Sequence, residues 1–221
     1  MSTPQAVLAA PLDHLADPDP AIRRLAVSLA APLVVEPGPG ERLLAVLAGD
    51  GDGAVRAAAA EALGGLPAGS SLAEPVTAAL LDAIGDDDAR VVEAAVTALG
   101  ELPARPAVVA RLLGIAADDS ADKLVREAAV ASLGALADPV ALPVLLELLA
   151  TGPPPVRRRA VVALTVFDDP AVEPALRRAT ADRNPMVREV AEMVVGHPSE
   201  NSPLPSRRGG EAAERAEGQD G

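Results

Sequence analysis

Residues 55–64 read VRAAAAEALG, and the pattern they set returns in five other places along the chain. An apolar residue, here called the anchor, is usually followed by arginine, and an alanine stands four positions after the anchor. The anchors are Ile22, Val55, Val91, Val125, Val156 and Val187, and the alanines are Ala26, Ala59, Ala95, Ala129, Ala160 and Ala191. Neighbouring anchors lie 31 to 36 residues apart, and such a period indicates a protein of stacked repeats.

The apolar spacing after each anchor predicts a helix. In the second copy the apolar residues follow the i, i+3, i+4, i+7, i+8 rule of one helix face: Val55, Ala58, Ala59, Ala62 and Leu63. Another apolar-periodic segment precedes each anchor, and we expect first helices at Gln5–Leu15, Glu41–Ala48, Glu74–Ile84, Ala107–Ala117, Val140–Ala150 and Ala171–Ala181. Two helices per period predict an all-α fold, a right-handed α-solenoid of about six helix-turn-helix units.

Residues with special backbone roles mark the helix ends. Five positions before the anchors stand residues that suit a turn and accept backbone N–H groups, Asp17, Asp50, Asp86, Ser120, Thr151 and Asp182. A left-handed cap is predicted at the glycines that end three second helices, Gly64, Gly100 and Gly134. A true first turn or a kink is predicted where proline falls inside an expected first helix, at Pro11, Pro143 and Pro174.

The repeats define the domain organisation. One solenoid is expected over residues 1–196, with units at about 5–33, 41–66, 74–102, 106–136, 138–167 and 169–196. Residues 197–221 are rich in Pro, Ser, Gly, Glu and Arg, and almost no apolar residue occurs there. Because such a segment cannot bury a core, we expect a disordered C-terminal tail.

Composition excludes several classes of function. The formal charge of −13 disfavours nucleic acid as a partner, because phosphate binding needs a clustered positive surface. There is no cysteine, and Phe167 is the only aromatic residue, so disulfides, thiolate metal sites and aromatic cages are excluded. No signal peptide or apolar run long enough for a bilayer is seen, and we expect a monomeric cytoplasmic protein without membrane contact. One lysine, Lys123, against 18 arginines indicates a GC-rich bacterial genome, such as that of an actinobacterium.

No recognisable catalytic or metal-binding constellation appears. The two histidines, His14 and His197, are isolated, and no serine has a histidine in its unit to serve as a base. The acidic runs at residues 86–88 and 118–122 lack the spacing and glycine of a calcium loop. The sequence therefore predicts no cofactor, no metal and no enzymatic activity.

Two segments carry a family resemblance. Residues 169–176, DPAVEPAL, followed by residues 182–191, DRNPMVREVA, resemble HEAT-like repeats of the phycobilisome-lyase type, and residues 138–143 do so too. The resemblance extends over about residues 5–196. It implies a scaffold or adaptor, and in a few branches an enzyme.

The resemblance also implies a structural ladder, because Asp and Arg of the turns pair along the stack in proteins of this kind. Carried over here, the ladder consists of Asp17, Asp50, Asp86 and Asp182 with Arg23, Arg56, Arg126, Arg157 and Arg188. Val92 replaces an arginine, for which Arg90 is a possible substitute, and Thr151 replaces an aspartate. Ligand binding by the same arginines is the alternative interpretation.

Three enzymatic branches of similar proteins fit poorly. The hydroxylase branch holds two irons with His-Glu pairs, which this chain lacks. The DNA-glycosylase branch uses a basic face and aromatic residues against the base. Bilin lyases act on cysteine-linked pigments in organisms with phycobilisomes, and the inferred genome type does not match these. A lyase-type enzyme or an enzyme accessory subunit stays open as the alternative function.

The predicted function is a non-catalytic scaffold or adaptor that recognises another protein or peptide. The second helices are expected to line a concave face, with partner-binding residues at Arg24, Glu61, Glu93, Thr97, Glu127, Arg158, Glu189 and Glu192. A solvated face without a partner is the plainer interpretation of the same residues.

The fifth unit and the tail offer further binding elements. Residues 156–167 combine apolar residues on more than one face with three consecutive arginines, as interface centres do, although tighter packing between units explains the pattern equally. Phe167 is expected in the core. A third interpretation is an acidic accessory protein that is recruited through residues 197–221.

Overall fold

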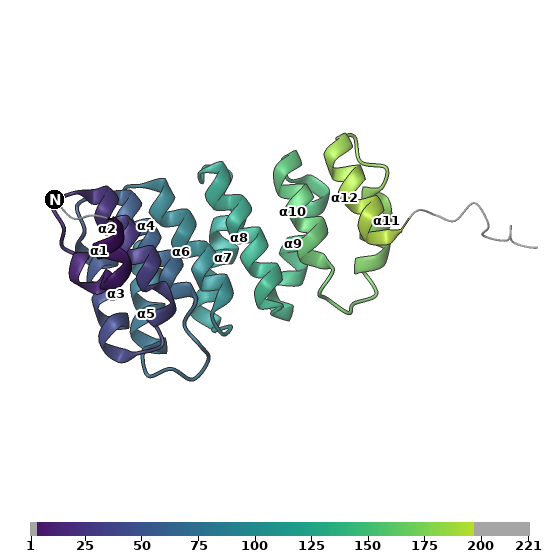
Figure 1. Ribbon diagram of the computed structural model, residues 1–221. Helices are drawn as coiled ribbons and strands as arrows, with labels where there is room; N and C mark the ends of the chain where they lie inside the picture. The colour runs from purple at the N-terminus through teal and green to yellow at the C-terminus, as the bar shows by residue number, and fades with distance from the viewer. Residues whose placement is uncertain (1–3, 197–221) are drawn as a thin grey trace, which may run out of the picture.

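The computed structural model describes residues 4–196, and every regular element in that range is helical (Figure 1). The first helices of the six units are α1 (Pro4–Ala9), α3 (Pro37–Gly49), α5 (Ala73–Ala83), α7 (Pro106–Ala117), α9 (Leu142–Thr151) and α11 (Val172–Ala179). The second helices are α2 (Pro20–Ala30), α4 (Gly53–Gly64), α6 (Ala89–Glu101), α8 (Lys123–Leu136), α10 (Pro154–Leu164) and α12 (Pro185–Val195). Short 3₁₀ helices are η1 (Pro11–His14), η2 (Ala31–Leu33) and η3 (Pro139–Ala141).

The helices stack as an α-solenoid, which confirms the predicted fold class. Each first helix packs on the second helix of its own unit, and the second helices form an unbroken row from α2 to α12. Within this row, contacts between neighbouring helices are more extensive than those among the first helices. The tail expected at residues 197–221 lies outside the described residues.

The second helices begin at polar caps. The cap side chain accepts backbone N–H groups from the first turn in five of them, at Asp19, Asp52, Asp88, Asp122 and Asn184. The caps thus lie two residues after the positions singled out in the sequence. Those earlier aspartates still accept a backbone N–H, that of the cap residue, at Asp17, Asp50, Asp86 and Asp182.

Proline decides where the first helices start. The expected helix Gln5–Leu15 is broken, because α1 ends at Ala9 and η1 starts at Pro11. In the second unit α3 begins a turn earlier than expected, with Pro37 as its first residue. The prolines at 143 and 174 stand in the first turns of α9 and α11, so they mark helix starts and not kinks.

A single apolar core runs the length of the stack. The alanine four positions after each anchor has no exposed surface in any of the six units. Five anchors are also buried, and Ile22 packs against the core from its edge. The repeated side chains in the core are Ala, Val and Leu, so the second helices can approach one another closely.

The closest approach falls at glycine, and the predicted left-handed caps are wrong. Gly64, Gly100 and Gly134 lie inside α4, α6 and α8, and none of them has a positive φ. A Cβ atom on Gly134 would come within 2.7 Å of the Cα of Ala163 in α10, and one on Gly100 within 2.8 Å of the Cα of Ser132 in α8. Glycine is therefore used where the backbones of successive second helices meet.

A pair of alanine substitutions tests this packing. Gly134→Ala is expected to destabilise the fold by about 1–3 kcal/mol, because the new methyl group meets backbone of the next unit. Gly114→Ala in α7 is the matched control, since a Cβ atom there meets nothing within 4 Å. It should stabilise by about 0.5–1 kcal/mol through helix propensity. Urea unfolding followed by circular dichroism measures both, and equal effects of the two substitutions would contradict the account.

Candidate partner-binding face

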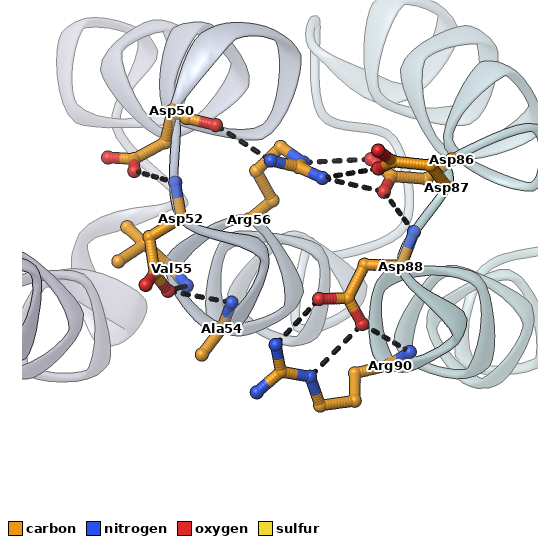
Figure 2. A network of polar contacts seen from close by, with 9 residues as sticks. All are labelled: Asp50, Asp52, Ala54, Val55, Arg56, Asp86, Asp87, Asp88 and Arg90. Atoms are coloured by element: carbon orange, nitrogen blue, oxygen red, sulfur yellow. Dashed lines mark hydrogen bonds and ion pairs between the residues drawn. The ribbon is translucent and has the colours of Figure 1, made fainter.

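A ladder of ion pairs joins neighbouring units at the edge where the second helices begin, and Figure 2 shows the pair between units two and three. Arg56 donates from Nε and Nη2 to the two carboxylate oxygens of Asp86 in the next unit, at 2.8 and 2.7 Å. Its Nη1 donates to the backbone oxygen of Asp50, at 2.9 Å. A single arginine therefore bridges its own turn and the following one, and Asp87 adds a further contact at 3.1 Å.

The same Arg–Asp pair, here called a rung, occurs at two other junctions between units. Arg23 forks onto Asp50 at 2.7 and 2.8 Å, and Arg157 forks onto Asp182 at 2.8 and 2.7 Å. The Arg157 side chain is only 3% exposed, so this last pair is the most buried of the three. At the end of the described stack Arg188 keeps the bond to its own turn, to the backbone oxygen of Asp182.

The ladder is interrupted at two junctions in the middle of the stack. Between the third and fourth units both partners are absent, since Val92 and Ser120 occupy the positions of arginine and aspartate. Arg90 does not substitute for the missing arginine, because it pairs with Asp88 at the start of its own helix and lowers the pKa of that carboxyl to about 2.

At the next junction the arginine stays but changes its partner. Arg126 stands opposite Thr151, and it turns back to its own unit. There it contacts Asp119 at 2.6 Å and donates to the backbone oxygen of Ala116 at 2.8 Å. Units three to five are therefore held together without an Arg–Asp rung.

A cavity of about 340 Å³ lies at the first gap in the ladder, and Val92 lines it together with Asp86, Arg111, Asp118 and Asp122. These carboxylates serve the local turns. Asp118 accepts from the backbone and hydroxyl of Ser120, and Asp122 caps α8. Across residues 4–196 no group of three His, Cys, Asp or Glu side chains is placed to hold a metal ion.

The exposed face of the second helices consists of one strip per helix. The residues two and six positions after an anchor are one turn apart and share one side of the helix, and the tenth position continues this side at the end of the helix or just beyond it. Most of the predicted partner-binding residues lie on this strip. The exposed ones are Arg24, Glu61, Thr97 and Glu189, and the half-buried ones are Glu93 and Arg158.

Two predicted partner-binding residues have other surroundings. Glu127 is buried, and its carboxylate lies 3.7 Å from Arg158 and 4.0 Å from Arg159 in the next unit. Glu192 stands five positions after its anchor, where every earlier unit has a buried Val or Ala that is covered by the next unit. It therefore lies at the end of the stack and not on the strip.

Sequence reasoning missed the apolar half of the strip. Six positions after the anchors, the first three units have Ser28, Glu61 and Thr97, and the last three have Ala131, Val162 and Met193. Ten positions after the anchors, Ala135 and Val166 continue the apolar surface in units four and five. The repeat register contained this signal, because the sixth position could have been compared across all six units.

The three consecutive arginines of the fifth unit divide between two roles. Arg157 forms the ladder rung, whereas Arg158 and Arg159 approach the same carboxylate, that of Glu127. The apolar residues beside them reach the surface, since Val162 and Val166 are each about half exposed. Phe167 is half-buried and packs against the edge of the core.

No helix among residues 4–196 has the length and apolar character that crossing a membrane requires.

Comparison with known proteins points to one family. A family model of HEAT repeats matches residues 40–123 and 77–165, which together exceed half of the chain. No curated protein matches the sequence significantly. Among solved structures, Escherichia coli YibA is similar with a TM-score of 0.62 at 18% identity, over 88% of this chain and 75% of YibA. A designed armadillo repeat protein, solved in complex with the peptide (KR)4, gives a TM-score of 0.60 at 19% identity, over 85% of this chain and 98% of the design.

The most buried rung predicts a pH-dependent loss of stability. Hydrogen bonds from Arg157 lower the pKa of Asp182, so the carboxylate stabilises the fold at and above the ordinary aspartate range. This contribution is lost as the pH falls through the lowered pKa, below about pH 4. Asp182→Asn should destabilise by about 2–3 kcal/mol at pH 7, because a buried guanidinium loses its charged partner.

Urea unfolding at a series of pH values measures this effect. The difference in unfolding free energy between wild type and Asp182→Asn should shrink as the pH falls from 5 to 3. Asp82→Asn on the exposed side of α5 is the control and should behave like wild type. A difference that stays constant down to pH 3 would contradict the assigned role of Asp182.

Proposed function

The chain belongs to the HEAT-repeat family, and we propose that it is a non-catalytic adaptor that binds another protein or peptide on the exposed strip of its second helices. One observation carries the proposal. The strip positions of six consecutive helices lie in register, and the other sides of these helices are used for packing within the unit and against its neighbours. A surface of this kind can follow an extended or helical partner over several units.

The packing of the two rows supports the choice of face. Neighbouring second helices contact one another more closely than neighbouring first helices do. In a curved stack the more closely spaced row lies on the inner side, so we infer that the strip faces the concave side. The designed armadillo repeat protein similar in fold was solved with a bound peptide, which supports a peptide as the class of ligand.

Other expectations from the sequence stay predictions. These are the cytoplasmic location, the monomeric state and the absence of catalysis. No specific observation among residues 4–196 favours the alternative of a lyase-type enzyme or an enzyme subunit, and we do not propose it.

Affinity capture with a pair of matched triple variants tests the proposal. The face variant carries Glu61→Arg, Val162→Arg and Glu189→Arg, which are exposed residues on the strip. The control variant carries Glu41→Arg, Val140→Arg and Glu147→Arg, which are exposed residues of the first-helix segments and change the charge equally. The tagged proteins are purified from their own cells after a helical spectrum has been confirmed for each.

The proposal predicts a partner that is retained by wild type and by the control variant and reduced at least tenfold with the face variant. Partners that are retained equally by all three proteins would contradict binding on the strip. Partners lost from both variants alike would assign the effect to net charge and would also contradict it.

A further inference from the structure

The strip changes character halfway along the stack. In units one to three its sixth and tenth positions are polar or small, and they include Glu61, Thr97 and Glu101. In units four to six the same positions are apolar and exposed, at Ala131, Ala135, Val162, Val166 and Met193. Val162, Val166 and Met193 are 52%, 53% and 72% exposed. Large apolar side chains that lie together on one exposed face are typical of a contact surface.

Positive charge borders this apolar surface. Arg158 and Arg159, at the start of α10, both approach the single carboxylate of Glu127, at 3.7 and 4.0 Å. One carboxylate therefore balances two guanidinium groups, and the Arg159 side chain is 49% exposed. The positions equivalent to Arg158 in units four and six are Glu127 and Glu189, so α10 is the one helix of this half with arginine at that strip position. This local charge is opposite to the net charge of −13 of the whole chain.

We propose that the apolar half of the strip, in units four to six, binds an amphipathic segment of the partner, with aliphatic side chains on Val162, Val166 and Met193 and an Asp or Glu carboxylate on Arg158 and Arg159. The inference rests on the proposed adaptor function and specifies its ligand. We expect an acidic residue in the ligand because of charge complementarity. Glu127 neutralises one of the two guanidinium charges, and a carboxylate of the ligand between Arg158 and Arg159 would neutralise the other.

The size of the surface suits a short segment. Packed helices lie about 8–10 Å apart, so three consecutive second helices span about 20 Å. This distance corresponds to about 13 residues of an α-helix. An aliphatic residue at i and i+4 with an acidic residue one turn away would match the rows of the strip.

Peptide display on the full chain tests the inference. A random peptide library on phage is selected against the wild-type protein, and the enriched peptides are synthesised for affinity measurement by calorimetry. We expect aliphatic residues at i, i+4 spacing with a nearby Asp or Glu. Val162→Asp, Val166→Asp and Arg159→Glu should each weaken binding at least tenfold. Val140→Asp, at another exposed valine, and Glu41→Arg, on a first helix, should leave the affinity unchanged.

The outcomes separate this inference from the adaptor function. Enriched peptides that are basic, and whose binding is lost with Glu61→Arg and not with Val162→Asp, would overturn the inference and leave the adaptor function standing. Peptides that respond to no substitution on the strip would overturn both.

Two further experiments test whether another ligand occupies the apolar half of the strip. If a synthetic peptide of residues 197–221 binds the chain truncated after Gly196, and Val162→Asp abolishes this binding, the chain's own C-terminal segment is the ligand and the inference is wrong. If sedimentation shows a dimer of wild type that Val162→Asp dissociates, a second copy covers the surface, and the inference is wrong as well.

Discussion

Close approach of successive second helices is the constraint on which the rest of this structure depends. At the contact between α6 and α8, Gly100 lies against Ser132, and the hydroxyl of Ser132 donates to the backbone oxygen of Val96 at 2.9 Å. At the contact between α8 and α10, Gly134 lies against Ala163. Every side chain in these columns must be small or take part in a hydrogen bond across the junction. The turn edge and the exposed strip lie outside these columns, and the units differ in both places.

The turn edge shows how the stack handles buried charge. Three junctions have a complete Arg–Asp rung, and the junction between units three and four lacks both partners, Val92 and Ser120 standing in their place. When both the arginine and the aspartate are absent, no charge is left unpaired. When only one of them is absent, the other is a buried charge without a partner, which destabilises the fold. Arg126, which did lose its partner across the junction, is neutralised within its own unit by Asp119. The two middle junctions are thus joined without an Arg–Asp pair, by apolar packing with the Ser132–Val96 hydrogen bond and the contacts of Glu127 with Arg158 and Arg159. In this part of the stack the strip turns from polar to apolar.

The repeat period predicted the number of units and the two helices of each, because apolar periodicity is a local property of the sequence. The errors came from contacts between units. Gly64, Gly100 and Gly134 resembled helix caps because a sequence does not show how closely the next helix approaches. Glu127 was expected to face outward from the geometry of its own helix, but Arg158 and Arg159 of the next unit cover it. Glu192 was assigned to the binding face, although its column is the one each unit turns toward its successor.

The central claim is that a partner binds the strip and not another face of the second helices, and α12 offers a direct test. The chain has three methionines, and two of them, Met186 and Met193, are exposed on α12, with Met193 on the strip and Met186 outside it. Methyl-labelled methionine gives a simple NMR spectrum, in which each signal is assigned by a Met→Leu substitution. On addition of the captured partner or a selected peptide, the Met193 signal should shift or broaden while the Met186 signal stays in place. A shift of Met186 without Met193, or no change in either signal at saturation, would contradict binding on the apolar half of the strip.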